Sequence, residues 1–192
     1  GVSNLIAAGA DVNARENSRD QTALMWAAAQ NHVDVVKVLI KAGANLEAKS
    51  KLRPRLMYFE SSNGAAFDRG VMEELGGYSA FLFAAARGNV EIGKLLIGSG
   101  VDLDGVAGNG ASALVVATHS GHSDFARTLL EAGADPNAIG AGYNAFHAAV
   151  LRGDVGTVEA LHVKGRDPNV RLKRATPVHS GSEDGAWKSP LG

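Results

Sequence analysis

The sequence predicts an all-α solenoid of stacked helix-turn-helix units with hairpin fingers. Three observations predict it: four stretches of the chain align with one another, their closing glycines recur at matching intervals, and the composition is rich in small residues. Of the 192 residues, 32 are alanine and 24 are glycine, whereas aromatic residues make up only 6%. Such an excess of small residues is typical of thin helices that pack closely and are separated by frequent turns.

The four aligned stretches begin at Thr22, Ser79, Ser112 and Asn144. Their first residues are 57, 33 and 32 positions apart, and the glycines that close the same stretches repeat these intervals. A period near 33 residues is typical of a supersecondary unit that buries its apolar face only against its neighbours. The longer first interval indicates an insertion of 24 residues between the first two full units.

Each unit is expected to contain two helices. Its first residue is Thr, Ser or Asn, which are side chains that cap a helix by accepting a backbone hydrogen bond. Paired alanines such as Ala84 and Ala85 follow, and they allow close approach of a neighbouring helix. A residue that tolerates a positive φ then breaks the helix, as at Asn31 or Gly88. The second run is amphipathic, with aliphatic residues at i, i+3, i+4 and i+7.

The period divides the chain into seven segments. We expect a partial unit with a second helix and finger, four full units, one insertion loop, and an incomplete next unit or second loop insertion. In chain order these are residues 1–14 (partial), 15–48, 49–76 (insertion), 77–106, 107–138, 139–171 and 172–192 (incomplete). The insertion begins with a basic cluster that includes Lys49 and Arg55, and a helical turn is expected at Val71 to Leu75.

The combination of helix, turn, helix and finger resembles the ankyrin repeat. The resemblance rests on T/S/N-A-L/F-x-x-A openings, the Asn-His or Gly-His break, the V-V-K-V-L-I and T-L-L second helices, and the A-G-A-D-x-N closures. It covers residues 2–171, and the sequence looks like a bacterial member of the family with an inserted finger loop. Alanine replaces the usual proline at the first helical position, as at Ala23. The replacement removes only the restriction that proline places on the φ angle, so the fold is not expected to change.

Several kinds of chemistry are not expected. The 19 basic and 20 acidic residues nearly balance, so the chain has no excess of positive charge to bind the phosphates of a nucleic acid. No apolar run is long enough to span a bilayer. We predict no catalytic residue, no cofactor and no metal site, since His119 and His122 lack a third ligand. His32, His122 and His147 are expected to be structural, and aspartates that recur in register, such as Asp102 and Asp135, are expected to shape the finger turns.

We expect binding where residue types vary at a fixed register. The resemblance implies that this surface comprises the fingers and the exposed, concave side of the first helices. The candidate partner-binding residues are Arg19, Gln21, Gln30, Tyr78, Arg87, Asn109, His119, Tyr143, Leu151 and Arg152. Tyr and Arg are enriched at interface hot spots, and the two tyrosines and the two arginines each share a register two repeats apart. We hypothesise a two-node contact surface with His119 and Asn109 between the nodes.

The sequence therefore predicts a protein–protein interaction module that binds a protein partner. The basic insertion could fold over the groove or clasp an acidic partner, or it could pack its own aromatic residues on neighbouring fingers. A first alternative is a structural spacer or a self-stacking, filament-forming repeat array, which could associate through its open repeat ends. A second is a regulatory segment of a larger enzyme.

Overall fold

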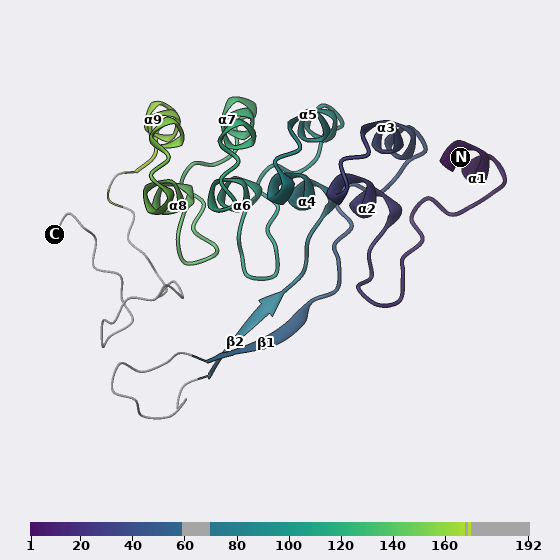
Figure 1. The fold of residues 1–192 in the computed structure, drawn as a ribbon, viewed down its shortest axis with the longest axis horizontal. Coiled ribbons are helices and arrows are strands. Elements are labelled where there is room, and N and C mark those ends of the chain that lie inside the picture. Colours follow the sequence, from purple (N-terminus) through teal and green to yellow (C-terminus); the bar gives the residue numbers. More distant parts are fainter. Residues whose placement is uncertain (59–69, 168, 170–192) are drawn as a thin grey trace.

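The structure is a computed structural model that describes residues 1–58, 70–167 and 169, with only the backbone described at 56–58 and 70–73. Its helices stack in two parallel rows (Figure 1). The first-helix row contains α2 (Ala23–Ala29), α4 (Ala80–Arg87), α6 (Ala113–His119) and α8 (Ala145–Arg152). The second-helix row contains α1 (Val2–Ala7), α3 (Val33–Lys41), α5 (Val90–Gly98), α7 (Ser123–Ala132) and α9 (Val155–Val163). The predicted all-α ankyrin-type solenoid is confirmed.

Each first helix begins at its predicted cap. The side chains of Thr22, Ser79, Ser112 and Asn144 each accept a hydrogen bond from the backbone N–H three residues later. At Asn144 the cap is reciprocal, because the ring of His147 faces the backbone N–H of Asn144. The break after each first helix has a positive φ, 59° at Asn31 and 68° at Gly88, for example. Caps and breaks together fix where each helix starts and stops.

The core lies between the two rows and between neighbouring repeats. The paired alanines of the first helices are buried, with Ala28, Ala85 and Ala149 each 0% exposed. One leucine in each of α3, α5, α7 and α9 faces them from the same register and is at most 2% exposed. These leucines are Leu39, Leu96, Leu129 and Leu161. Small side chains on one row and larger ones on the other give a thin core that continues along the stack.

A hydrogen-bond ladder joins the finger turns that follow the second helices. In these turns the side chains of Asp11, Asn45, Asp102, Asp135 and Asp167 accept the backbone N–H two residues later. The predicted turn role of the aspartates is confirmed. The side chain two positions further on then reaches the next repeat. These links join Asn13 to Asn45, Glu47 to Asp102, Asp104 to Asp135 and Asn137 to Asp167.

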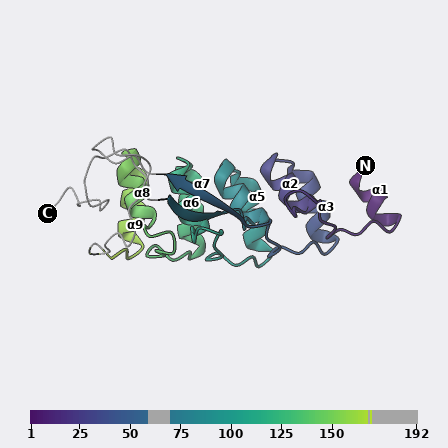
Figure 2. The same cartoon turned by 90° about the horizontal axis from the view of Figure 1, so that it is seen from below.

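Residues 53–75 contain an antiparallel hairpin of β1 (Arg53–Tyr58) and β2 (Gly70–Leu75). The hairpin leaves the stack between α2 and α4 and runs toward the end at which α8 and α9 lie (Figures 1 and 2). The helical turn predicted at Val71 to Leu75 is therefore wrong. These residues pair with β1 instead, with Leu75 opposite Arg53 and Gly70 opposite Tyr58.

The base of the hairpin is fixed to the fingers on both sides. The N–H of Lys51 donates to the carbonyl of Arg19 (2.8 Å), and the N–H of Gly108 donates to the carbonyl of Gly76 (2.9 Å). Gly76 has a φ of 95°, and a Cβ there would lie 2.2 Å from the carbonyl oxygen of Lys51. Only glycine fits this position, which closes the hairpin onto the next repeat.

Candidate partner-binding surface

Five of the ten predicted contacts lie on the first-helix face, by which we mean the exposed residues of α2, α4, α6 and α8 and the exposed residue directly after α2. Each of these helices ends on one of them, or is followed directly by one. Gln30, Arg87, His119, Leu151 and Arg152 are all exposed, with Leu151 at 47%. The buried alanines lie on the side of each first helix that faces the core, and these residues lie on the opposite, exposed side.

Two of the predicted tyrosines lie where the fingers meet the first helices. The Tyr78 ring packs against Phe83 of α4, with centroids 5.3 Å apart, and burial raises the pKa of its phenol. Tyr143 packs against His119 of the preceding repeat, with centroids 6.1 Å apart. Both tyrosines are partly buried. Each offers part of its ring to solvent while its neighbour restricts its rotamer.

Arg152 connects two repeats. Its Nη1 donates to the carbonyl of His119, 2.9 Å away, so it satisfies a carbonyl at the end of α6. The guanidinium lies over Gly121, where a Cβ would come within 2.5 Å of Nη2. The structure thus brings Arg152, His119 and Tyr143 into one cluster. Arg87, which shares the register of Arg152 two repeats earlier, is exposed at the end of α4.

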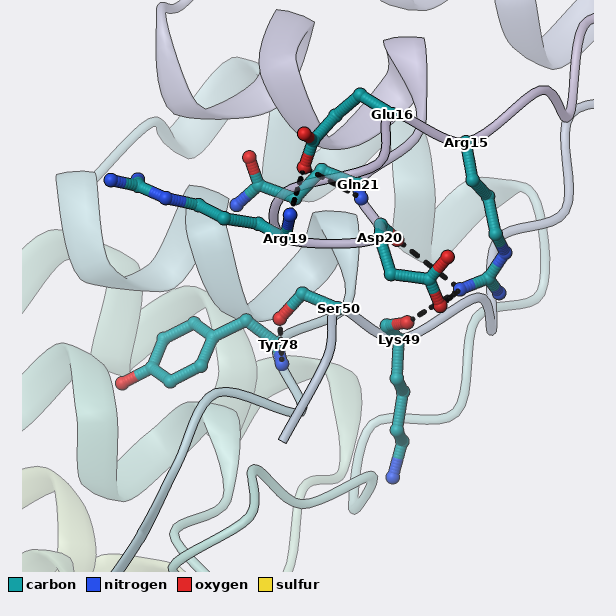
Figure 3. Close-up of polar contacts among 8 residues, drawn as sticks. All are labelled: Arg15, Glu16, Arg19, Asp20, Gln21, Lys49, Ser50 and Tyr78. Atoms are coloured by element: carbon teal, nitrogen blue, oxygen red, sulfur yellow. Dashed lines mark hydrogen bonds and ion pairs between the residues drawn. The ribbon is translucent and has the colours of Figure 1, made fainter. Parts of the chain in front are cut away.

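The finger before α2 presents Arg19 on the same side as Tyr78 (Figure 3). Glu16 shapes this finger by accepting hydrogen bonds from the Ser18 hydroxyl (2.6 Å) and from the N–H of Arg19 (2.6 Å). The Ser18 hydroxyl is the largest influence that lowers the pKa of Glu16, from 4.5 to about 2. Arg15 pairs with Asp20 (2.6 Å) and also donates to the carbonyl of Lys49. Arg19 is thereby held at a well-ordered turn.

Two predicted contacts are not free surface residues. Gln21 is only 9% exposed, because it lies directly before the N-cap of α2 and is enclosed by the finger. Its assignment as an exposed contact is therefore wrong. Asn109 is partly buried, and its Oδ1 accepts the N–H of Ala111 (3.1 Å), so it shapes its own finger.

Sequence reasoning missed Trp26. This side chain is 49% exposed on α2, at the register of Phe83 in α4 and Val116 in α6. Val116 is only 6% exposed, because a first helix packs on each side of α6, whereas α2 has a first-helix neighbour only at α4. The equivalent residues of α4 and α6 are more buried, so the register alone does not predict that Trp26 is exposed. Its exposure follows from the position of α2 in the first-helix row.

The histidine interpretation holds where contacts test it. The Nε2 of His122 lies 3.1 Å from the carbonyl oxygen of Ala86 in the preceding repeat, so this ring joins two repeats as predicted. His147 belongs to the cap of α8. Across the part of the chain that the structure describes, no group of three or more His, Asp or Glu residues could hold a metal ion. No helix there is long and apolar enough to cross a membrane.

Comparison with known proteins agrees with this architecture. A family model of three ankyrin repeats matches residues 55–140, and a single-repeat model matches residues 19–51. The chain belongs to the ankyrin-repeat family. Ankyrin repeats generally mediate protein–protein interaction.

Similar proteins carry the same repeat. The ankyrin repeat and KH domain-containing protein mask-1 of Caenorhabditis elegans is 29% identical over 152 residues, which is 78% of this chain and 5% of the relative. Human ankyrin repeat domain-containing protein 29 is 45% identical over 60 residues, which is 31% of this chain and 20% of the relative. The chain thus spans only a small part of these curated relatives. Both are animal proteins, and they lend the expected bacterial origin no support.

Proposed function

We propose that this ankyrin array binds a protein partner through the first-helix face, the adjoining fingers and the base of the hairpin. The observation that carries the proposal is the gathering of hot-spot side chains on this side of the array. Tyr78, Arg87, Tyr143 and Arg152 come from α4 and α8 or from the residues just before these two helices. Trp, Tyr and Arg dominate binding energy at protein interfaces.

The local contacts favour such a role because they restrict side chains before any partner binds. Tyr143 lies against His119, and Arg152 is bonded to the His119 carbonyl. Ordering a flexible side chain on binding costs roughly 0.5–1.5 kcal/mol, so a restricted one loses less. Arg152 uses one of its five N–H donors on His119, and the guanidinium group can donate further bonds to a partner.

The test is the simultaneous replacement of Tyr78, Arg87, Tyr143 and Arg152 with alanine. A partner is first isolated with the intact array as bait, then purified, and its Kd is measured by calorimetry. We expect the affinity to fall at least about 100-fold, because a single hot-spot truncation costs about 2 kcal/mol or more. Circular dichroism establishes that the variant is folded.

A matched control lies on the second-helix row. Lys41, Lys94, Glu131 and Glu159 are exposed there, and their replacement with alanine also changes four side chains. This control is expected to bind the partner like the wild type. Unchanged affinity in the first variant, or equal loss in both, would refute the proposed surface.

A second candidate function is end-to-end self-association, and the exposure of two registers favours it. Val150 of α8 is 44% exposed, although Ala28, Ala85 and Thr118 at the same register are each 0% exposed. Trp26 is exposed in the same manner at the other end of the first-helix row. If the two ends fit each other, copies would join head to tail into a filament.

Light scattering over a range of concentrations separates this candidate from the first. Self-association predicts a mass that grows with concentration, and the double variant Trp26→Glu, Val150→Asp should abolish the growth. A constant monomer mass for the wild type excludes it. The role of a regulatory segment within a larger enzyme stays a prediction.

A further inference from the structure

Charge is distributed unequally between the two helix rows. The first helices α2, α4, α6 and α8 contain no Asp or Glu, and their charged residues are Arg87 and Arg152. The second helices α3, α5, α7 and α9 carry five acidic residues, Asp34, Glu91, Asp124, Glu131 and Glu159, and four basic ones, Lys37, Lys41, Lys94 and Arg127. The net charge of −1 for the whole chain conceals this difference.

Charges of both signs occur on the second-helix row, and several of them pair with one another. Lys37 lies 3.3 Å from Glu91 of the next repeat and 3.8 Å from Asp34, and Arg127 pairs with Asp124. By contrast, no ion pair between described residues involves Arg87 or Arg152. The first-helix face therefore keeps positive charge that the rest of the described structure leaves uncompensated.

The carboxylates of the finger turns do not supply that compensation. Asp102, Asp104 and Asp135 each accept a backbone N–H in the turns that follow the second helices. Asp20 pairs with Arg15, and Glu16 accepts bonds within its own finger. These carboxylates are engaged by local donors.

A third cation extends the positive side of the array. Arg19 is exposed, its side chain projects on the same side as Tyr78, and no ion pair between described residues involves it (Figure 3). Lys51 is exposed beside this finger, since its N–H is bonded to the carbonyl of Arg19. Cations thus occur at the finger end of the first-helix face, at Arg19, and at its helix-break end, at Arg87 and Arg152.

We propose that the first-helix face takes an acidic, carboxylate-rich segment of the partner protein. This inference rests on the proposed function and names the chemistry of the bound segment. Carboxylates can accept paired hydrogen bonds from the planar guanidinium groups of Arg19, Arg87 and Arg152. The exposed part of the Tyr78 ring would contact apolar side chains between the acidic ones. Complementary charge also selects against basic partners.

The probe is a fluorescein-labelled peptide of alternating Glu and Ala, compared with a Gln and Ala peptide of the same length. The full chain at low ionic strength is expected to bind the Glu peptide at least about tenfold more tightly than the Gln peptide, since bonds to charged groups add about 1.5–3 kcal/mol each. The affinity should weaken as salt rises. Fluorescence anisotropy measures both effects.

Two charge-reversal variants locate the binding. Arg87→Glu with Arg152→Glu should remove Glu-peptide binding. Lys41→Glu with Lys94→Glu makes the same change of net charge on the second-helix row and should weaken it less than about twofold. Both lysines are exposed and take part in no ion pair between described residues. Because Arg152 also bonds His119, Arg152→Gln with Arg87→Gln provides a milder second variant, which should show the same loss.

Specific results would overturn the inference. They are equal binding of the Glu and Gln peptides, no binding of the Glu peptide, equal loss in the two reversal variants, or equally tight binding of a single-stranded oligo-dT. The last result would indicate a general polyanion surface. If the isolated partner depends on Tyr78, Arg87, Tyr143 and Arg152 but its bound segment has no excess of Asp and Glu, this inference fails and the proposed function stands.

Discussion

The carboxylate of Glu47 accepts a hydrogen bond from the backbone N–H of Asp102, 2.9 Å away and 55 positions later in the chain. The equivalent link between Asn13 and Asn45 spans 32 positions. The ladder of finger turns therefore continues across the hairpin as if the repeats were adjacent in sequence. The stack is defined by these contacts between repeats, whatever length of chain separates them.

Removal of this link should destabilise the array locally. Glu47→Ala leaves the N–H of Asp102 without its protein acceptor, and we expect a loss of about 1 kcal/mol in the free energy of unfolding. Glu47→Gln keeps an acceptor oxygen and should retain most of the stability. Urea unfolding followed by circular dichroism measures both variants. Equal stability of the Ala and Gln variants would show that the link contributes nothing.

The base of the hairpin should depend on Gly76. Gly76→Ala places a Cβ against the carbonyl of Lys51 at a φ of 95°, and we expect a loss of at least about 2 kcal/mol. Gly98→Ala is the matched control, because it ends α5 at an ordinary φ with nothing within 4 Å of the new Cβ. The control should be neutral or more stable by up to about 1 kcal/mol. Thermal unfolding that shows equal effects would contradict this assignment.

The stabilising contribution of Glu16 to its finger should be lost only at low pH. Because the pKa of Glu16 in the folded chain is about 2, below its ordinary 4.5, its stabilising contribution is fully present above about pH 4.5 and is lost as the pH falls through about 2. The carboxyl carbon shift of Glu16, followed by NMR during acid titration, measures this pKa. Ser18→Ala should raise it toward 4.5, since the Ser18 hydroxyl is the largest cause of the shift. An apparent pKa near 4.5 in the wild type would disprove the prediction.

The same substitution at one register should reduce stability by very different amounts in neighbouring repeats. Thr118 is 0% exposed and Val150, at the equivalent position of α8, is 44% exposed. We expect Thr118→Asp to destabilise the chain by about 3 kcal/mol or more, because it buries an unpaired charge. Val150→Asp should cost less than about 1 kcal/mol. Chemical denaturation of the two variants gives the comparison, and similar losses would mean that Val150 is covered in solution.

Much of the fold could be predicted from the sequence because its signals are local and repeated. Capping by Ser79 depends on the next three residues, and the break at Gly88 depends on one backbone angle. The strand Gly70–Leu75 could not be predicted in this way. Its Met-Glu-Glu-Leu stretch favours a helix, and pairing with Arg53–Tyr58 overrides that preference.

The candidate surface was only partly predictable, because exposure depends on neighbours in space. Arg87 and Arg152 follow from the end of each first helix, which turns away from the core in every repeat. Gln21 occupies a register that seemed exposed, but its finger folds over it. Trp26 shares a register with buried Val116 and is exposed because of the place of α2 in the row. Registers predict which side a residue faces, and the ends of the array and the finger conformations decide what covers it.

The contacts at the base of the hairpin make the spacing of the repeats independent of the length of the hairpin. Because Arg19, Gly76 and Gly108 fix its two ends, extra residues between Tyr58 and Gly70 would add mainly loop-closure entropy, about 0.6 kcal/mol for each doubling of length. Foreign peptide sequences could therefore be grafted at the hairpin tip while the helix rows keep their register. The array offers a display scaffold with one adjustable site between two of its repeats.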